Sequence, residues 1–346
     1  MLTGHTGFKG SWLALWLTEL GANVVGLALP PDTRPNHWDL LKLDIKQYRN
    51  DIRDSANILR VLAEVRPEIV FHLAAQPLVR RSYREPLETW STNVMGTANV
   101  LEAVRQNSGV KAVVIVTTDK CYLNQEWLWG YREVDRLGGH DPYSASKAAC
   151  ELVAASYRQA FFAGAEWPLL ATARAGNVIG GGDWSEDRLI PDLVRAVVQN
   201  EDLEIRSPKA TRPWQHVLES LGGYLLLGQQ LLEGRQDKAA AWNFGPDANG
   251  NFSVAEVLDG LKTHWPELRW RPTREAQSHE ATLLYLDSSM AKARLGWRPV
   301  WTLEHSLAAT SAWYRNYYAD GRLETRAQLQ DYIDCARAAG VVWSQA

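Results

Sequence analysis

The chain has 346 residues, of which 46% are hydrophobic and 22% are charged, and its formal net charge is −3. This composition fits a globular protein with a full core, and it gives no reason to expect nucleic acid or an anionic membrane as a partner. The three cysteines are scattered, and no apolar run reaches membrane-spanning length, which argues against a disulfide framework, a cysteine zinc site and a membrane anchor. We therefore expect a cytoplasmic protein without a metal site.

Short β-rich runs alternate with amphipathic helical stretches over the first half of the chain. We expect buried strands at 24–29, 68–74, 111–118 and 169–179. Helical patterns lie between them at 10–20, 55–65, 86–106 and 144–161. This alternation predicts an α/β fold with a Rossmann-like, doubly wound parallel sheet. Past about residue 180 the rhythm loosens, and the strand candidates, such as 202–207 and 240–246, are short, which predicts a smaller second lobe.

A glycine motif, G-x-x-G-x-x-G over residues 4–10, precedes the first helical pattern. Such a turn lets the backbone approach a pyrophosphate, and the following helix directs its positive N-terminal end at the phosphates. The acidic sequence "DIRD" at 51–54 strengthens the prediction of a dinucleotide site. The residues leave NAD and NADP open, because Asp32 could bond a ribose whereas Arg34 could favour a 2′-phosphate.

The first strand is unusually short in the sequence. The motif starts at Thr3 and leaves only Met1 and Leu2 before it, whereas a strand normally runs ~5–6 residues. We expect the native chain to begin a few residues upstream, with an apolar strand before Thr3.

Tyr143 and Lys147 lie four residues apart in "YSASK", on one face of a predicted helix. A nearby ammonium favours the phenolate and lowers the pKa of a tyrosine towards the range of a base. The helix follows the strand that ends in Thr118, and ligands of such sheets gather at the carboxyl ends of the strands. Thr118, Tyr143 and Lys147 are therefore predicted to handle protons in a hydride-transferring enzyme.

Taken together, these motifs make the chain resemble the extended short-chain dehydrogenase/reductase family, in its group of nucleotide-sugar dehydratases and epimerases. The resemblance runs through "TGHTGFKG", "FHLAAQ", "VVIVTTDKCY", "YSASK" and "GNVIGGGDW", and it covers nearly the whole chain. "AAQPLVRRSY", "TTDKCY" and "WGYRE" are similar to the CDP-glucose 4,6-dehydratase branch. The resemblance implies NAD as cofactor, CDP-glucose as substrate, a role in deoxysugar and lipopolysaccharide synthesis, and a homodimer or larger homo-oligomer. The dimer would form through the helices that hold Met95 and Lys147.

The same resemblance implies roles for individual residues. The catalytic residues would be Thr118, Asp119, Lys120, Tyr143 and Lys147. The cofactor would contact Gly4, Thr6, Gly7, Phe8, Lys9, Gly10, Asp51, Ile52, Leu73, Ala74, Ala75, Thr117, Tyr143 and Lys147. The substrate would contact Gln76, Ser82, Asn177, Arg188 and Arg212, of which Arg212 matches the pyrophosphate arginine. Further candidates from the residues are Arg206, which could bind a pyrophosphate in bidentate fashion, and His279. Trp184 and Trp214 could border the cytosine, although they fit the core equally well. We expect an NAD-binding domain over 1–178 and mainly a substrate lobe over 179–346, interleaved with the last elements of the first domain.

Three functions remain open at this point: a 4,6-dehydratase, a 4-epimerase or 4-reductase on the same fold, and a non-catalytic NAD-binding sensor or scaffold. Asp119 and Lys120 favour the first, because chemistry at C4 alone leaves this pair without a task. Once C4 is a ketone, one group must remove the C5 proton and another must protonate the leaving C6 hydroxyl.

We expect Asp119 to be the acid at C6 and Lys120 the base at C5. An ammonium cannot take up a proton, so Lys120 must be neutral, and an ionised Asp119 beside it would oppose that. The two roles are compatible only if Asp119 stays protonated. The alternative is that Lys120 binds the substrate electrostatically.

Overall fold

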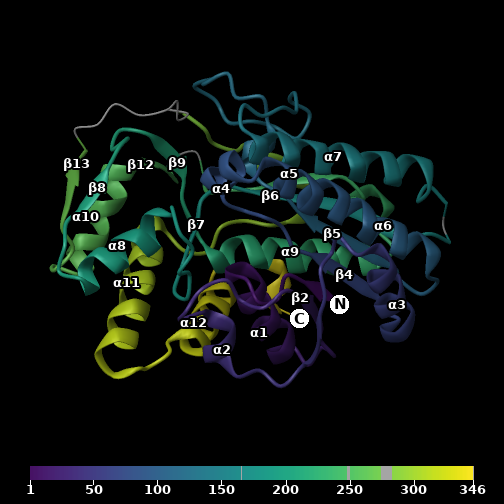
Figure 1. Ribbon diagram of the computed structural model, residues 1–346, viewed down its shortest axis with the longest axis horizontal. Coiled ribbons are helices and arrows are strands. Elements are labelled where there is room, and N and C mark those ends of the chain that lie inside the picture. Colours follow the sequence, from purple (N-terminus) through teal and green to yellow (C-terminus); the bar gives the residue numbers. More distant parts are fainter. Residues whose placement is uncertain (165, 248–249, 274–282, 346) are drawn as a thin grey trace.

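A parallel sheet forms the centre of the computed structural model, which describes residues 1–164, 166–247, 250–273 and 283–345 (Figure 1). Its seven strands have the order β11-β6-β5-β4-β1-β2-β3, and every neighbouring pair is parallel. The strands are β1 (Leu2–Thr3), β2 (Val25–Ala28), β3 (Lys46–Arg49), β4 (Ile69–His72), β5 (Ala112–Val116), β6 (Leu169–Ala175) and β11 (Ala241–Phe244). The predicted α/β class with a Rossmann-like doubly wound sheet is confirmed.

Helices cover both faces of this sheet, and the pleat of the strands explains why. Successive side chains of a strand point to opposite faces. Thus Val114 of β5 packs in the core beneath α1 (Phe8–Glu19) and α9 (Val217–Leu232), whereas Val113 packs in the core with α3 (Ser55–Val65) and α6 (Gly96–Gln106). Both faces are therefore apolar, as buried parallel strands require.

Further helices complete the first half of the chain. The long α7 (Pro142–Ala160) packs beside α6 and begins at Asp141, whose side chain caps the helix by accepting from the Ser144 N–H. A short 3₁₀ turn, η2 (Asp119–Cys121), follows β5. The remaining elements of this half are α2 (His37–Leu41), α4 (Val79–Arg84), α5 (Pro86–Trp90) and η1 (Ser91–Met95).

Part of the second half of the chain forms a smaller lobe beside the sheet, on the left of Figure 1, whereas α9 and β11 belong to the central layers. Its strands pair two by two as β10 (Gln215–His216) with β7 (Val178–Ile179), β12 (Asn251–Ser253) with β9 (Thr211–Pro213), and β13 (Trp270–Pro272) with β8 (Leu203–Ile205). Its helices include α8 (Leu189–Val198), α10 (Val254–His264) and α11 (Leu303–Asp320). The other short elements pack near the sheet: η3 (Gln236–Lys238) on α9, η5 (Ala291–Leu295) on β11, and α12 (Thr325–Ala338) and η6 (Val342–Gln345) on α1. Within the described part of the chain, no helix combines the length and the apolar content needed to cross a membrane.

Two predicted strands differ from the structure, and one strand of the central sheet was missed. The predicted strand 169–179 is divided into β6 and β7, which belong to different sheets. The division falls at Gly176, where an added Cβ would lie 2.4 Å from Pro213 Cγ. The segment 240–246 supplies β11, an edge strand of the central sheet, because α9 carries the chain back under the sheet beside β6. Strand β3 was not predicted at all.

Candidate active site

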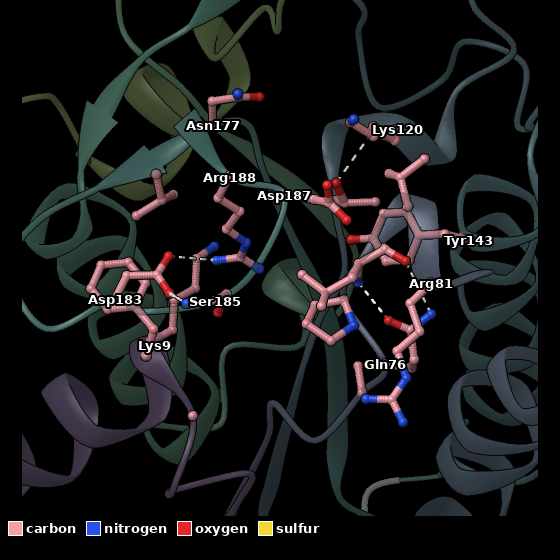
Figure 2. A pocket seen from close by; sticks show the side chains of 18 of the residues that line it. Lys9, Gln76, Arg81, Lys120, Tyr143, Asn177, Asp183, Ser185, Asp187 and Arg188 are labelled. Atoms are coloured by element: carbon pink, nitrogen blue, oxygen red, sulfur yellow. Dashed lines mark hydrogen bonds and ion pairs between the residues drawn. The ribbon is translucent and has the colours of Figure 1, made fainter. Parts of the chain in front are cut away.

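A cavity of about 1470 Å³ opens at the carboxyl edge of the central sheet. Its wall is built by the segments that follow β1, β2, β4, β5 and β6, and by residues of the smaller lobe that face them. Figure 2 shows the two sides: Lys9, Asp183 and Arg188 lie opposite Lys120 and Tyr143. The sequence analysis predicts a ligand site at this edge of the sheet.

The glycine loop fits the phosphates of a dinucleotide. Gly4 has a φ of +73°, and a Cβ there would lie 2.6 Å from the backbone nitrogen of Ala74. A Cβ at Gly10 would lie 2.0 Å from the Gly4 carbonyl oxygen, so α1 packs tightly against the loop. Gly7 caps α1 without any side-chain hydrogen bond, and it lines the cavity. The first turn of α1 is therefore a cradle for an anion.

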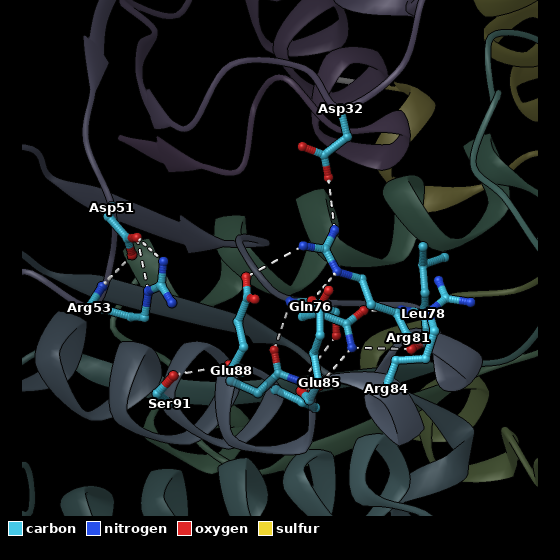
Figure 3. A network of polar contacts seen from close by, with 12 residues as sticks. Asp32, Asp51, Arg53, Gln76, Leu78, Arg81, Arg84, Glu85, Glu88 and Ser91 are labelled. Carbon is cyan, nitrogen blue, oxygen red and sulfur yellow. Dashed lines mark hydrogen bonds and ion pairs between the residues drawn. The ribbon is translucent and has the colours of Figure 1, made fainter.

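Charged side chains pair with one another at the outer end of the cavity, where the segments that follow β2, β3 and β4 lie (Figure 3). Asp51 accepts from the Arg53 guanidinium at 2.6 Å. Arg81 of α4 bonds Glu85 at 2.8 Å and lies 3.8 Å from Asp32, whose side chain is 80% exposed. Asp32 and Asp51 thus both line the cavity at this end, whereas Arg34 lies outside its described lining.

Thr118, Tyr143 and Lys147 are brought together in the cavity. Tyr143 and Lys147 come from the first two turns of α7, and Thr118 follows β5. The Thr118 hydroxyl hydrogen-bonds the Tyr143 phenol and donates to Asp119 Oδ1 at 3.0 Å. Lys147 Nζ donates to the Val116 carbonyl at 3.3 Å, and burial lowers the pKa of Lys147.

The expected lowering of the Tyr143 pKa is wrong for this structure. Burial raises the pKa of Tyr143, and it outweighs the opposite effects of the Thr118 hydrogen bond and the Arg188 charge. Helical spacing places Lys147 near Tyr143, but the Lys147 ammonium donates to the Val116 carbonyl. Desolvation therefore decides the direction of the shift.

Asp119 is a buried carboxyl group in the wall of the cavity, with only 1% of its surface exposed. Its Oδ2 has no hydrogen-bond partner among the described residues, and a Cβ at Gly176 would lie 3.0 Å from this oxygen. Burial raises the pKa of Asp119, and the charges of Lys120 and Arg212 only partly offset this. Lys120 is half-buried and lies next to Asp119 in the turn η2.

Lys9 was predicted as a cofactor contact, and it reaches into the same cavity. Its Nζ donates to the Tyr224 hydroxyl at 3.2 Å. Burial, together with the like charge of Arg188, lowers the pKa of Lys9 to about 7. Lys9 thus lies within electrostatic reach of two further basic groups, Arg188 and Lys147, and of the carboxyl group of Asp119.

Most of the predicted substrate contacts line the cavity, namely Gln76, Asn177, Arg188, Arg206 and Arg212. Arg188 forms an ion pair with Asp183 at 3.0 Å. Ser82 is not brought to the cavity: its side chain is fully buried, and its hydroxyl donates to the Val79 carbonyl at 2.6 Å within α4. His279 lies outside the described residues.

All the predicted cofactor contacts line the cavity: Gly4, Thr6, Gly7, Phe8, Lys9, Gly10, Asp51, Ile52, Leu73, Ala74, Ala75, Thr117, Tyr143 and Lys147. Trp184 and Trp214 line it as well, although each is largely buried in the main core cluster. These two tryptophans thus combine a core position with a face towards the site.

The sequence analysis missed a set of ion pairs across the mouth of the cavity. Arg80 lies 2.7 Å from Asp187, and Arg84 lies 2.7 Å from Glu186. These pairs join α4 to the loop before α8, and their members are more than a hundred residues apart in the chain. No local pattern in the sequence indicates such a pair.

Comparison with known families agrees with the geometry of the site. A family model described as GDP-mannose 4,6 dehydratase matches residues 1–310. The chain is 47% identical over 341 residues to a CDP-glucose 4,6-dehydratase of Salmonella typhimurium, which covers 96% of this chain and 95% of that protein. It is 27% identical over 339 residues to a dTDP-glucose 4,6-dehydratase of Xanthomonas campestris pv. campestris, over 91% of this chain and 92% of that protein.

Solved structures share the fold. MoeE5 in complex with UDP-glucose and NAD superposes with a TM-score of 0.76 at 27% identity, over 92% of this chain and 99% of that chain. UDP-glucose 4-epimerase of Thermotoga maritima with UDP-glucose gives a TM-score of 0.79 at 23% identity, over 92% of this chain and 98% of that chain. The second likeness concerns the fold alone.

Proposed function

The chain belongs to the GDP-mannose 4,6 dehydratase family, and within it we propose that this protein is a CDP-glucose 4,6-dehydratase. One observation carries the proposal: Asp119 and Lys120 lie in the same cavity as Thr118, Tyr143 and Lys147. The second set suffices for chemistry at C4 of a hexose. The first set adds an acid and an amine, which an epimerase or a 4-reductase does not need.

NAD is the proposed cofactor. The chemistry that bound NAD supplies is reversible hydride transfer, first from C4 of the sugar and finally to C6. The loop from Gly4 to Gly10 would hold the pyrophosphate, since its glycines leave room for the backbone to approach and α1 begins there uncapped. Asp51, Ile52 and the segment Leu73–Ala75 would contact the adenosine and the inner ribose.

Tyr143 would act as the base at C4 by taking the proton of the C4 hydroxyl. Its phenol lies beside the Thr118 hydroxyl, which donates to Asp119 Oδ1 in this structure and would turn to donate to the C4 oxygen as charge develops there. The positive charge of Arg188 lowers the pKa of Tyr143 and so assists the base role, although burial raises this pKa overall. Lys147, anchored on the Val116 carbonyl, would orient the ribose of the cofactor next to Tyr143.

Asp119 would protonate the C6 hydroxyl as it leaves, and Lys120 would remove the C5 proton. The acid role requires a protonated carboxyl group, and burial shifts the pKa of Asp119 in that direction. Asp119 Oδ2 has no hydrogen-bond partner among the described residues, so it can bond a substrate hydroxyl. Lys120 lies next to Asp119 in η2 and lines the same cavity, so both groups can reach one bound sugar.

The substrate would be held from the smaller lobe. Arg188 and Arg212 can pair with the two phosphates of a nucleoside diphosphate, as planar guanidinium groups do. Asn177 and Gln76 line the same space and offer amide groups to the sugar and phosphate oxygens. The choice of cytosine rests on the relative that is 47% identical.

We further propose a homodimer, formed through the helices that hold Met95 and Lys147. Large apolar side chains are exposed on this side, including Leu87, Trp90 and Met95 before α6, and Leu152 on α7. Such a set on neighbouring helices is typical of an interface between helices of two copies.

All three cysteines are free thiols, which supports a reducing compartment such as the cytoplasm.

The direct test incubates the protein with CDP-glucose and NAD and follows the alkali-induced absorbance of a 4-keto sugar. A 4,6-dehydratase yields this absorbance and a product that has lost one water by mass. A 4-epimerase would yield an isomer of unchanged mass without a 4-keto sugar, and a non-catalytic sensor would bind both compounds and change neither.

A further inference from the structure

A buried ionic cluster lies behind the turn η2, and its two charged members, Glu151 and Arg174, lie outside the cavity lining. Arg174 of β6 and Glu151 of α7 form an ion pair at 2.7 Å, with exposed side-chain fractions of 4% and 3%. Glu151 also accepts from the hydroxyls of Thr117, at 2.5 Å, and Thr172, at 2.7 Å. This carboxylate is thus bonded by three groups: Thr117, which directly follows β5, and Thr172 and Arg174, which both belong to β6.

The cluster reaches the catalytic turn through Tyr122. Arg174 donates to the Tyr122 hydroxyl at 2.7 Å, and its guanidinium lies over the Tyr122 ring at 5.0 Å. Tyr122 in turn donates to Asn243 Oδ1 at 2.7 Å. Tyr122 directly follows the turn η2 that contains Asp119 and Lys120, so its position limits where that turn can lie.

The Asn243 end of this chain of hydrogen bonds is also fixed. Asn243 Nδ2 donates to the Tyr131 carbonyl at 2.8 Å, and Arg174 donates to the Glu133 carbonyl at 3.1 Å. The backbone of η2 is also held directly, because the Gly138 N–H donates to the Cys121 carbonyl at 2.9 Å. Arg174 Nε has no hydrogen-bond partner among the described residues, but the other polar groups named here each bond a specific partner.

We propose that Glu151, Arg174 and Tyr122 are positioning residues that set the Asp119–Lys120 turn for the elimination of water, while the C4 step is left largely independent of them. This proposal rests on the proposed 4,6-dehydratase function. The reason is geometric: Tyr143 and Lys147 stand on the long helix α7 and Thr118 follows β5 as the N-cap of η2, whereas Asp119 and Lys120 stand on this short 3₁₀ turn itself. A short turn keeps its side chains within the tolerance of proton transfer only if its far end is fixed.

The charges in the cluster support its rigidity. Burial alone would raise the pKa of Glu151, but the charge and hydrogen bond of Arg174 and the two threonine hydroxyls lower it overall. Glu151 is therefore an anion, and a buried anion keeps its cation in place because an unpaired charge would be costly there. Arg174 needs its planar fork to reach Glu151 and Tyr122 at once, which a lysine cannot do.

Tyr122→Phe and Arg174→Lys test the proposal. Tyr122→Phe keeps the aromatic ring and removes one hydroxyl. Arg174→Lys keeps the positive charge and removes the planar guanidinium group that bonds two partners at once. With CDP-glucose and NAD in heavy water, single turnovers report C4 oxidation as reduced nicotinamide and elimination as deuterium at C5 and 4-keto product. We expect elimination to fall about 10- to 100-fold in each variant while C4 oxidation stays close to that of the unsubstituted protein. The double variant should lose no more than the worse single variant, because both changes break the same link.

Tyr332→Phe is the matched control, because it removes another buried tyrosine hydroxyl that is bonded to a buried carboxylate, Glu219, at 2.9 Å away from the cavity lining. It should leave the ratio of the two rates unchanged. Equal losses of oxidation and elimination in Tyr122→Phe, or no loss at all, would overturn the proposal, as would additive losses in the double variant. If Arg174→Lys does not fold, Tyr122→Phe alone decides. If the unsubstituted protein forms no 4-keto product, the proposed function fails instead.

Discussion

Charged side chains are exposed at one end of the cavity and buried at the other end. At the outer end, Arg81 pairs with Glu85 while 30% and 44% of their side chains remain exposed, and Asp32 is almost fully in water. At the inner end, Asp119 has an oxygen without a partner among the described residues, and Glu151 and Arg174 directly behind this end are all but completely buried. Both ends are dense in charged groups, but only the inner end removes them from water.

This difference separates binding from chemistry. Exposed ion pairs are screened by water and salt and contribute little to stability, but they can guide a charged ligand into the cavity. Buried groups have shifted pKa values, and shifted values are what a proton-transfer site requires. We therefore expect substitutions at the inner end to change reaction steps, and substitutions at the outer end to change mainly affinity.

The largest effect is expected from Tyr143→Phe, which removes the base at C4. Turnover should fall ~10²- to 10⁴-fold, the usual contribution of an acid–base group. The variant should still bind CDP-glucose and NAD, since the ring keeps its place in the wall of the cavity. Steady-state formation of the 4-keto sugar measures the loss, and near-normal turnover would remove Tyr143 from the mechanism.

Asp119→Asn should come next. We expect elimination to fall about 10²-fold, because the amide cannot donate an acidic proton to the C6 hydroxyl, while C4 oxidation continues. The pKa of Asp119 is raised in the folded state above its ordinary value of 3.8, so the folded state binds more protons and stability falls as pH rises above that value. Urea unfolding at several pH values should show a weaker fall for Asp119→Asn. A steeper fall would contradict the assigned direction of the shift.

The smallest effect is expected from Arg81→Met at the outer end. Loss of its exposed pairs should lower the free energy of unfolding by no more than about 1 kcal/mol. NAD affinity should weaken modestly at low salt, and the difference should shrink as salt rises, because the screening length falls to about 3 Å at 1 M. Calorimetric titration with NAD at two salt concentrations measures this. A large, salt-independent loss of C4 oxidation would erase the distinction between the two ends.

The sequence predicted the elements whose local signals agree with their packing. The helix expected at 55–65 is α3 with the same bounds, because Asp54 caps it and its apolar residues face the sheet. Strand β3 escaped prediction since its four residues, "KQYR", are polar and lie at the exposed edge of the sheet. The break at Gly176 also had no local signal, because its cause is the close approach of Pro213, a residue distant in the chain.

The site was predicted where motifs carry it and missed where tertiary contacts make it. The glycine loop, the turn after β5 and the start of α7 meet in one cavity, as parallel strands with a common carboxyl edge require. Ser82 was placed in the site by resemblance alone, and the structure turns its hydroxyl into α4. The partners of Arg174 come from α7, the turn region and the segment around Glu133, so only the folded chain reveals them.

The most direct test of the account uses Lys120→Met with CDP-glucose and NAD in heavy water. Methionine keeps much of the side-chain length and removes the amine that would take the C5 proton. We predict that reduced nicotinamide forms, since Thr118, Tyr143 and Lys147 are untouched, and that neither deuterium at C5 nor loss of water follows. Full dehydration with normal deuterium incorporation at C5 would contradict the account and leave Lys120 as a residue that only binds the substrate or faces solvent.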